Sequence, residues 1–161
     1  MISAAQGLAL TRIAVGGYFL SQAVDKTRSG WLADGTQMAG FIQQALARAE
    51  SVYSPFLETT VLPNASLFAQ LVTVGEWGVG TSLTLGLFTR LGALAGIAMV
   101  MNYMLMKGLA NNFGSNDRLF AVACLAFFLA SAGMTWGLDG WLAASLRQSP
   151  LTRWAVTRPG R

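Results

Sequence analysis

Two ionisable residues, Arg12 and Glu76, lie inside stretches of sequence that are otherwise apolar. Charged side chains are unfavourable in hydrocarbon, so within membrane helices they face the protein interior and often belong to proton or substrate paths. A guanidinium and a carboxylate can also neutralise each other as a buried pair, which fixes helix register without adding stability. We predict that Arg12 and Glu76 form such a pair, and the pattern leaves both a structural and a functional role open.

Asn102 and Tyr103 lie in a third apolar stretch, MVMNYMLM, and could extend this polar site. A carboxamide and a phenol can each hydrogen-bond a ligand oxygen, and a phenol can also pass on a proton. Each could equally form a hydrogen bond between two helices. Arg12, Glu76, Asn102 and Tyr103 are therefore the candidates for a buried polar site.

The residues that other kinds of chemistry need are absent from the chain. It has no His and a single Cys, Cys124 in the apolar run FAVACLAFFLA, so no disulfide can form within it. Without His there is no imidazole ligation of haem, no facial iron triad and no zinc-hydrolase site of the usual kind. The sequence also shows no nucleophile-base pair, metal cluster or phosphate-binding loop, and we predict no metal site.

The composition indicates that membrane spans position these residues. Hydrophobic residues make up 53% and charged residues 11% of the 161 residues, whereas roughly 25% of a soluble domain is charged. A helix needs about 20 apolar residues to cross the hydrocarbon core. We predict one all-α membrane domain, residues 1–161, folded as an integral membrane four-helix bundle with spans at residues 4–24, 66–87, 91–106 and 119–136.

The segment between the first two spans, residues 25–65, predicts a helical insertion. Its apolar residues recur at three- and four-residue spacing, which is typical of an amphipathic helix; they include Met38, Phe41, Ile42, Ala45 and Leu46. Asp34 and Gln37 have the spacing of a capping box at its start, and Ser54 with Pro55 predicts a second short helix. The insertion either only shields helix ends or covers a ligand or docks a partner.

The basic residues predict the orientation in the membrane. Four of them, Arg147, Arg153, Arg158 and Arg161, lie in residues 142–161, which we interpret as a cytoplasmic basic tail. Four spans place both termini on the same side, so we predict a multi-pass protein of the cytoplasmic (inner) membrane with the insertion outside. The basic residues form no patch with interleaved aromatic residues, and we predict no nucleic-acid partner.

Polar residues are also predicted to meet at the two membrane faces. Arg90, between the second and third spans, and Asp139, in WGLDGWL, fall at the same cytoplasmic level, and we predict that they pair. An outer polar rim is predicted where the first span ends and the fourth begins, from Asp25, Lys26, Asn116, Asp117 and Arg118.

Small residues on the spans predict where helix backbones approach closely. On the second span they form a ridge of Gly75, Gly78, Ser82 and Gly86. The third span has Gly92 and Gly96, and the fourth has Gly133 and Gly137. Such glycines support a bundle and identify no function.

Four of these segments together resemble the DoxX/DoxD-like family of small four-span bacterial and archaeal membrane proteins. They are LTRIAVGGYFLSQAVDK, VGEWGVGTSLTLGLFTRLGALAG, the ND before the last span, and WGLDGWL, and the resemblance extends from about Gly7 to Leu142. By position, the family's polar pattern falls on Arg12, Glu76, Arg90, Asn116, Asp117 and Asp139. The insertion from Asp25 to Pro63 is longer than in the shortest members.

The resemblance implies a bacterial or archaeal membrane protein. Some members of the family are small subunits of a thiosulfate:quinone oxidoreductase, and others are linked to membrane redox or stress complexes. The expected function is a subunit of a quinone-linked redox complex, with Arg12, Glu76, Asn102 and Tyr103 near a quinone or proton site. The alternative is a non-catalytic accessory subunit of a larger respiratory or photosynthetic assembly, and a small transporter is a third option. We expect membrane lipids and other membrane subunits as partners. We expect no cofactor held by this chain alone, and quinone is the one ligand that the resemblance suggests.

Overall fold

The computed structural model describes residues 2–110 and 116–145, and all regular structure in these ranges is helical. The prediction of an all-α chain is therefore confirmed. The helices are α1 (Ala4–Arg28), α2 (Thr36–Leu46), α3 (Ser54–Phe56), the π-helical turn η1 (Leu57–Val61), α4 (Ala65–Leu85), α5 (Thr89–Lys107), α6 (Asp117–Leu129) and α7 (Leu138–Ser145). Most of the predicted basic tail, including its four arginines, lies outside the described residues.

The closest helix packing joins α1 to α4. A Cβ atom added to Gly16 of α1 would lie 2.5 Å from the backbone nitrogen of Thr84, and one added to Gly80 of α4 would lie 2.8 Å from that of Leu20. Only glycine fits at such separations. The ridge of small residues predicted on α4 is partly wrong. A Cβ atom at Gly78 would meet nothing, and the contact with α1 uses Gly80 instead.

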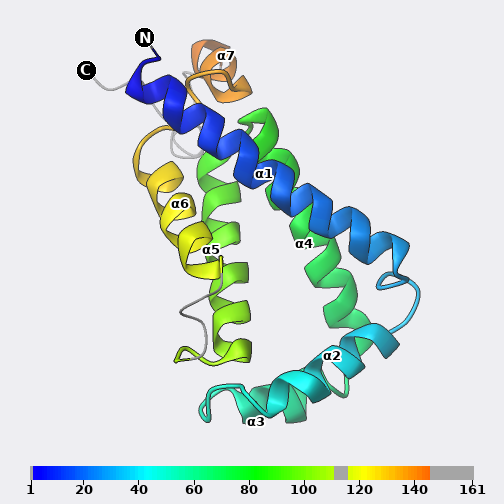
Figure 1. The fold of residues 1–161 in the computed structure, drawn as a ribbon. Helices are drawn as coiled ribbons and strands as arrows, with labels where there is room; N and C mark the ends of the chain where they lie inside the picture. The colour runs from blue at the N-terminus through cyan, green and yellow to red at the C-terminus, as the bar shows by residue number, and fades with distance from the viewer. Residues whose placement is uncertain (1, 111–115, 146–161) are drawn as a thin grey trace.

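The main core lies among α1, α4, α5 and α6. It is built from apolar side chains of all four helices and of the segment after α6: Val15, Phe19, Val79, Leu83, Ala93, Val100, Met104, Cys124, Phe127 and Ala132. Helix α6 packs against α5 (Figure 1). Cys124 is fully buried in this core, as expected for a thiol that serves as a small hydrophobe.

Residues 29–64, which we name the lid, connect α1 to α4 and contain α2, α3 and η1. In Figure 1, α4 and α5 lie close at one end and diverge toward the other, where α2 and α3 cross beneath them. The amphipathic helix predicted in the insertion is confirmed, and Met38 and Ile42 of α2 are buried against Leu57, Val61 and other residues of a second, smaller apolar core.

Helix α2 does not start with the predicted capping box. Its N-cap residue is Gly35, and Asp34 instead accepts a hydrogen bond of 2.8 Å from the backbone N–H of Thr36. This bond lowers the pKa of the exposed Asp34 carboxyl below its ordinary value. Helix α2 therefore begins one residue later than predicted, and Asp34 caps it from the position before the N-cap residue.

Helices α1, α4, α5 and α6 overlap the four predicted spans and differ from them in extent. Helix α6 ends at Leu129 instead of residue 136, and its 13 residues are about 20 Å long at 1.5 Å per residue. Among the described residues, α5 is the one helix that is long and apolar enough to cross a membrane by length and composition alone. For the remaining helices, membrane crossing stays a prediction.

Candidate functional site

Arg12 lies at the end of the bundle where α4 meets α5, which we name the hairpin end. Its side chain is fully buried, and its Nη1 donates a hydrogen bond of 2.6 Å to the carbonyl oxygen of Leu83 in the last turn of α4. Its Nη2 donates to the carbonyl oxygens of Trp136 at 2.9 Å and Thr135 at 3.4 Å. Carbonyl groups in the last turn of a helix lack intrahelical donors, so the guanidinium ties α1 to two chain segments through their backbone.

Asp139 is the acidic counterpart of Arg12 at the hairpin end and is also fully buried. Its carboxylate accepts hydrogen bonds from the backbone N–H groups of Phe88 at 2.7 Å and Thr89 at 2.9 Å. Phe88 has a φ of 48°, in the left-handed region that is strained for a bulky residue. A Cβ atom at Gly133 would collide with the Asp139 carboxylate, so this position accepts only glycine.

The two predicted ion pairs are both wrong. Arg12 does not meet Glu76, because it reaches toward the C-terminal carbonyl groups of α4, about 10 Å further along that helix. Arg90 does not pair with Asp139: its Nε donates to the carbonyl oxygen of Phe128 at 3.1 Å, and its guanidinium lies 5.4 Å from the Phe128 ring. Asp139 does bond to the segment between α4 and α5, but its partners there are the backbone amides of Phe88 and Thr89.

Glu76 lies nearer the opposite end of the bundle, which we name the lid end. The residue is 1% exposed, and its Oε1 accepts hydrogen bonds from Lys26 Nζ at 2.8 Å and from the Tyr103 hydroxyl at 2.7 Å. In the described part of the chain, its Oε2 is buried and has no hydrogen-bond partner. The Lys26 ammonium also lies over the rings of Trp31 at 5.3 Å and Tyr103 at 5.9 Å, which further stabilises the cation.

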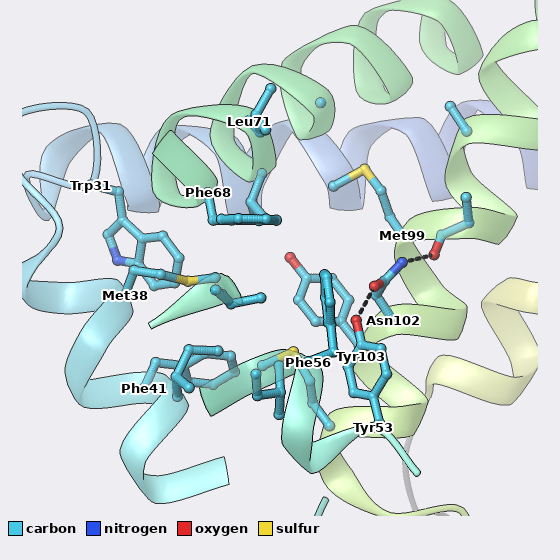
Figure 2. A pocket seen from close by; sticks show the side chains of 18 residues that line it. Trp31, Met38, Phe41, Tyr53, Phe56, Phe68, Leu71, Met99, Asn102 and Tyr103 are labelled. Atoms are coloured by element: carbon cyan, nitrogen blue, oxygen red, sulfur yellow. Dashed lines mark hydrogen bonds between the residues drawn. The ribbon is translucent and has the colours of Figure 1, made fainter. Parts of the chain in front are cut away.

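A cavity of about 390 Å³, which we name the pocket, lies between the lid, α4 and α5. Figure 2 shows aromatic and methionine side chains around it, among them Phe41, Phe56, Phe68 and Met99. The polar atoms of its wall come from Tyr53, Asn102, Tyr103 and the indole of Trp31. A largely apolar cavity with a few polar groups is the usual form of a site for a lipophilic small molecule.

Hydrogen bonds fasten the lid to α5 and to the residues just after it, beside the pocket. The Tyr53 hydroxyl donates to Asn102 Oδ1, and Asn102 Nδ2 donates to the carbonyl oxygen of Ala98 at 2.7 Å (Figure 2). Partial burial raises the pKa of Tyr53 above its ordinary value, so the hydroxyl stays protonated as a donor at neutral pH. Glu50 Oε1 accepts the backbone N–H of Leu109 at 2.5 Å.

A second cavity, of about 220 Å³, lies on the other side of Tyr103. It is the more polar of the two, since its wall includes Lys26, Glu76, Lys107 and Asp117. Lys107 Nζ pairs with Asp117 Oδ2 at 2.7 Å. Trp31, Phe41 and Tyr103 line both cavities and so form the partition between them.

The predicted outer rim is brought together in part. Lys26 and Asp117 line the second cavity, and Arg118 Nη2 donates to the carbonyl oxygen of Leu109 at 2.7 Å. Asp25 is exposed, and Asn116 is the N-cap residue of α6 without a side-chain capping bond. The rim residues therefore divide between the second cavity and the solvent-facing surface.

The sequence analysis missed the partners that complete the lid end. Lys26 was assigned to the rim and not to Glu76, while Lys107, Trp31 and Tyr53 were assigned to no site. The apolar face of α2 was the signal in the sequence that could have indicated these partners, because such a face must pack against another part of the protein. In the structure it packs where α4 and α5 diverge. Of the candidates, Asn102 and Tyr103 line the pocket, and Glu76 bonds to Tyr103 from the second cavity, whereas Arg12 lines neither cavity.

Comparison with known proteins gives one family. The family model described as DoxX matches residues 7–109, which is more than half of the chain and includes Arg12, Lys26, Glu76 and Tyr103. No curated protein and no solved structure matches.

Proposed function

Because the chain belongs to the DoxX family, a family of membrane proteins, we propose that it is an integral membrane subunit of a quinone-linked redox complex and that the pocket receives the quinone. The chain crosses the membrane four times. The first three crossings are α1, α4 and α5, and the fourth is α6 together with the segment that leads to α7. At 1.5 Å per residue, α1, α4 and α5 are about 28 to 38 Å long, which suits a hydrocarbon core of about 30 Å.

The outward faces of these helices support contact with lipid. Large apolar side chains are exposed along α4, α5 and α6: Leu67, Leu71, Val74, Leu91, Leu94, Leu119, Val122, Leu125 and Leu129. The charged residues Arg12 and Glu76 are buried within the protein instead, as is typical of charges at membrane depth. We place the lid on the outer side of a prokaryotic cytoplasmic membrane, with Arg90 and both termini on the cytoplasmic side.

The pocket is the observation that carries the quinone assignment. A quinone is an apolar ring with two carbonyl oxygens and a long hydrocarbon tail, so it needs an apolar cavity with hydrogen-bond donors at one wall. Tyr53, Asn102 and Tyr103 supply polar atoms there, while Leu71 and Met99 line the side between α4 and α5. Leu71 is also exposed on the outer face, so a tail can leave the pocket toward lipid.

Quinone binding by the isolated chain tests this proposal. The protein in lipid nanodiscs is titrated with decylubiquinone, and quenching of tryptophan fluorescence reports binding because Trp31 lines the pocket. Trp31→Phe identifies the share of the signal that comes from this residue. We expect saturable quenching with the wild-type chain.

A matched pair of variants locates the binding site. Ala98→Phe places a large ring in the pocket, and Val122→Phe places the same ring on the exposed face of α6. We expect Ala98→Phe to weaken binding about tenfold or more, equivalent to about 1.4 kcal/mol, and Val122→Phe to leave it unchanged. Absence of saturable binding to the wild-type chain would instead favour the non-catalytic accessory subunit.

A further inference from the structure

Tyr103 stands between the pocket and the second cavity, and it is the partition residue that has a hydroxyl group. It lines the pocket together with Asn102 and lines the second cavity together with Glu76 and Lys26. Trp31 and Phe41, the other two residues that line both cavities, offer no exchangeable oxygen-bound proton. Any transfer of a proton between the cavities therefore has Tyr103 as its available side chain.

A hydrogen-bonded series continues from this hydroxyl into the second cavity. The Tyr103 hydroxyl donates to Glu76 Oε1 at 2.7 Å, and the same oxygen accepts from Lys26 Nζ at 2.8 Å. Glu76 Oε2 is buried without a hydrogen-bond partner among the described residues. Oε2 is therefore the position at which Glu76 can accept an incoming proton, because Lys26 and Tyr103 both bond to Oε1.

The second cavity, which Glu76 and Lys26 line, reaches water at Lys107. The Lys107 side chain is 46% exposed and pairs with Asp117 at 2.7 Å across the second cavity. The ionisable groups that surround this cavity come from four helices: Tyr18 and Lys26 of α1, Glu76 of α4, Tyr103 and Lys107 of α5, and Asp117 of α6. Protons from solvent can therefore reach Glu76 without crossing the apolar wall of the pocket.

We propose that Tyr103 and Glu76 form the route by which a quinone in the pocket receives its protons, an inference that rests on the proposed function. A quinone gains two electrons and two protons when it becomes a quinol, and the electrons come from the dehydrogenase partner of the redox complex. For each proton, the Tyr103 hydroxyl turns from Glu76 to the quinone oxygen, and its O–H bond breaks as the proton passes across. A proton from solvent enters through the second cavity, protonates the Glu76 carboxylate and then passes to the tyrosinate, so that both groups return to their starting forms.

Three features distinguish this route from a structural ion pair. A pair that only fixes helix register needs two opposite charges, as in Lys26 and Glu76, and no cavity on either side. Here the carboxylate also holds the hydroxyl of a residue that lines an apolar pocket, and a polar cavity borders the carboxylate itself. The geometry supplies a donor at the ligand, an acceptor behind it and a solvent connection behind both.

Reduction of the bound quinone at an electrode tests the route without the redox partner. The full chain in nanodiscs, saturated with decylubiquinone, is subjected to a potential step, and quinol formation is followed by ultraviolet absorbance and infrared difference spectroscopy. We expect a carboxyl signal from Glu76 in the wild-type spectrum, and its loss in Glu76→Gln. We also expect Glu76→Gln and Tyr103→Phe to slow quinol formation about a hundredfold at neutral pH, as for the loss of a general acid.

Tyr103→Phe keeps the test valid if Glu76→Gln does not fold, because it leaves the Lys26–Glu76 ion pair in place. Thr73→Val is the matched control, because it also removes one hydroxyl from a buried residue. Thr73 lies one turn before Glu76 on α4, and the one hydrogen bond described for its hydroxyl is to the carbonyl oxygen of Ala69. We expect its rate to equal that of the wild-type chain.

The outcomes separate the two proposals. If decylubiquinone binds and is reduced as fast in Tyr103→Phe as in the wild-type chain, the proton route is wrong and the proposal of a quinone pocket stands. If the wild-type chain binds no quinone, the proposed function fails and the route fails with it. A slow Tyr103→Phe variant beside a wild-type rate in Thr73→Val supports both.

Discussion

The hairpin end and the lid end of the bundle both bury ionisable side chains, but these side chains bond to different kinds of partner. At the hairpin end, Arg12 and Asp139 bond to backbone carbonyl and N–H groups of segments far apart in the sequence. At the lid end, Glu76 bonds to the side chains of Lys26 and Tyr103 and lines the second cavity, and Tyr103 separates that cavity from the pocket.

This difference separates a structural role from a chemical one. Backbone groups keep their positions and cannot titrate, so a charge that binds them fixes the chain and gains no reactivity. Side-chain partners can move and exchange protons, and a cavity gives a ligand access to them. Four experiments can break or sharpen this comparison.

Arg12→Met should have the largest effect on stability. It leaves the carbonyl oxygens of Leu83 and Trp136 buried without a donor and removes the positive charge near Asp139. Loss of one member of a buried charged network typically costs about 3 to 5 kcal/mol. The free energy of unfolding in detergent measures it, with the exposed Arg28→Met as control. Equal stability of the two variants would contradict a clamp at the hairpin end.

Asp139→Asn should have the next largest effect. One side-chain oxygen remains for one backbone amide, while the new NH₂ group faces a second N–H donor at Phe88 or Thr89. A buried donor left unsatisfied costs about 1 to 3 kcal/mol. Unfolding of Asp139→Asn should be compared with that of Asp25→Asn, since Asp25 is exposed. Indistinguishable unfolding curves would show that the carboxylate does not hold the hairpin.

The double variant Lys26→Met with Glu76→Gln should have a smaller effect, within about 1 kcal/mol of the wild-type free energy of unfolding. It removes both charges together and retains an acceptor for the Tyr103 hydroxyl, and replacing both partners of a buried pair is often neutral. Glu76→Gln alone should be less stable than the double variant, because it leaves the Lys26 ammonium without a counter-charge. If the double variant unfolds as readily as Arg12→Met, the two ends do not differ as described.

The smallest effect is expected from Asp34, which caps α2 from the exposed surface. Its pKa is lower in the folded chain because its carboxylate accepts the Thr36 N–H bond. Its stabilisation is therefore fully present above the unfolded pKa of about 3.9 and is lost as the pH falls through the lower folded value. Hydrogen exchange of α2 across the acidic range measures this, and Asp34→Ala should remove that pH dependence. Unchanged pH dependence in Asp34→Ala would assign it to another group.

Helix periodicity and apolar composition were sufficient to predict the helical fold. The observed α1, α4 and α5 overlap the first three predicted spans, and the amphipathic pattern from Met38 to Leu46 correctly gave α2. The early end of α6 at Leu129 was not predictable from hydropathy, because the apolar residues continue beyond it. Ser131 has a φ of 50°, a left-handed conformation that no residue type there signals.

The pairing of the charges could not be predicted, because helical depth alone does not say which way a long side chain turns. Arg12 was placed within reach of Glu76, but backbone carbonyl oxygens at the end of α4 are also strong acceptors and leave no sign in the sequence. The same holds for Asp139, whose partners are amides of Phe88 and Thr89. Tyr103 and Asn102 were identified because a polar residue within an apolar span is visible as a residue type.

The lid returns to the place where it leaves the bundle. Gly35, just before α2, lies so close to the start of α4 that an added Cβ would be 2.5 Å from the backbone nitrogen of Ser66. A loop whose ends already touch can vary in length with little added closure entropy. The lid can thus change in length during evolution, or be replaced by another segment through protein engineering, without displacing α1 and α4, which it connects.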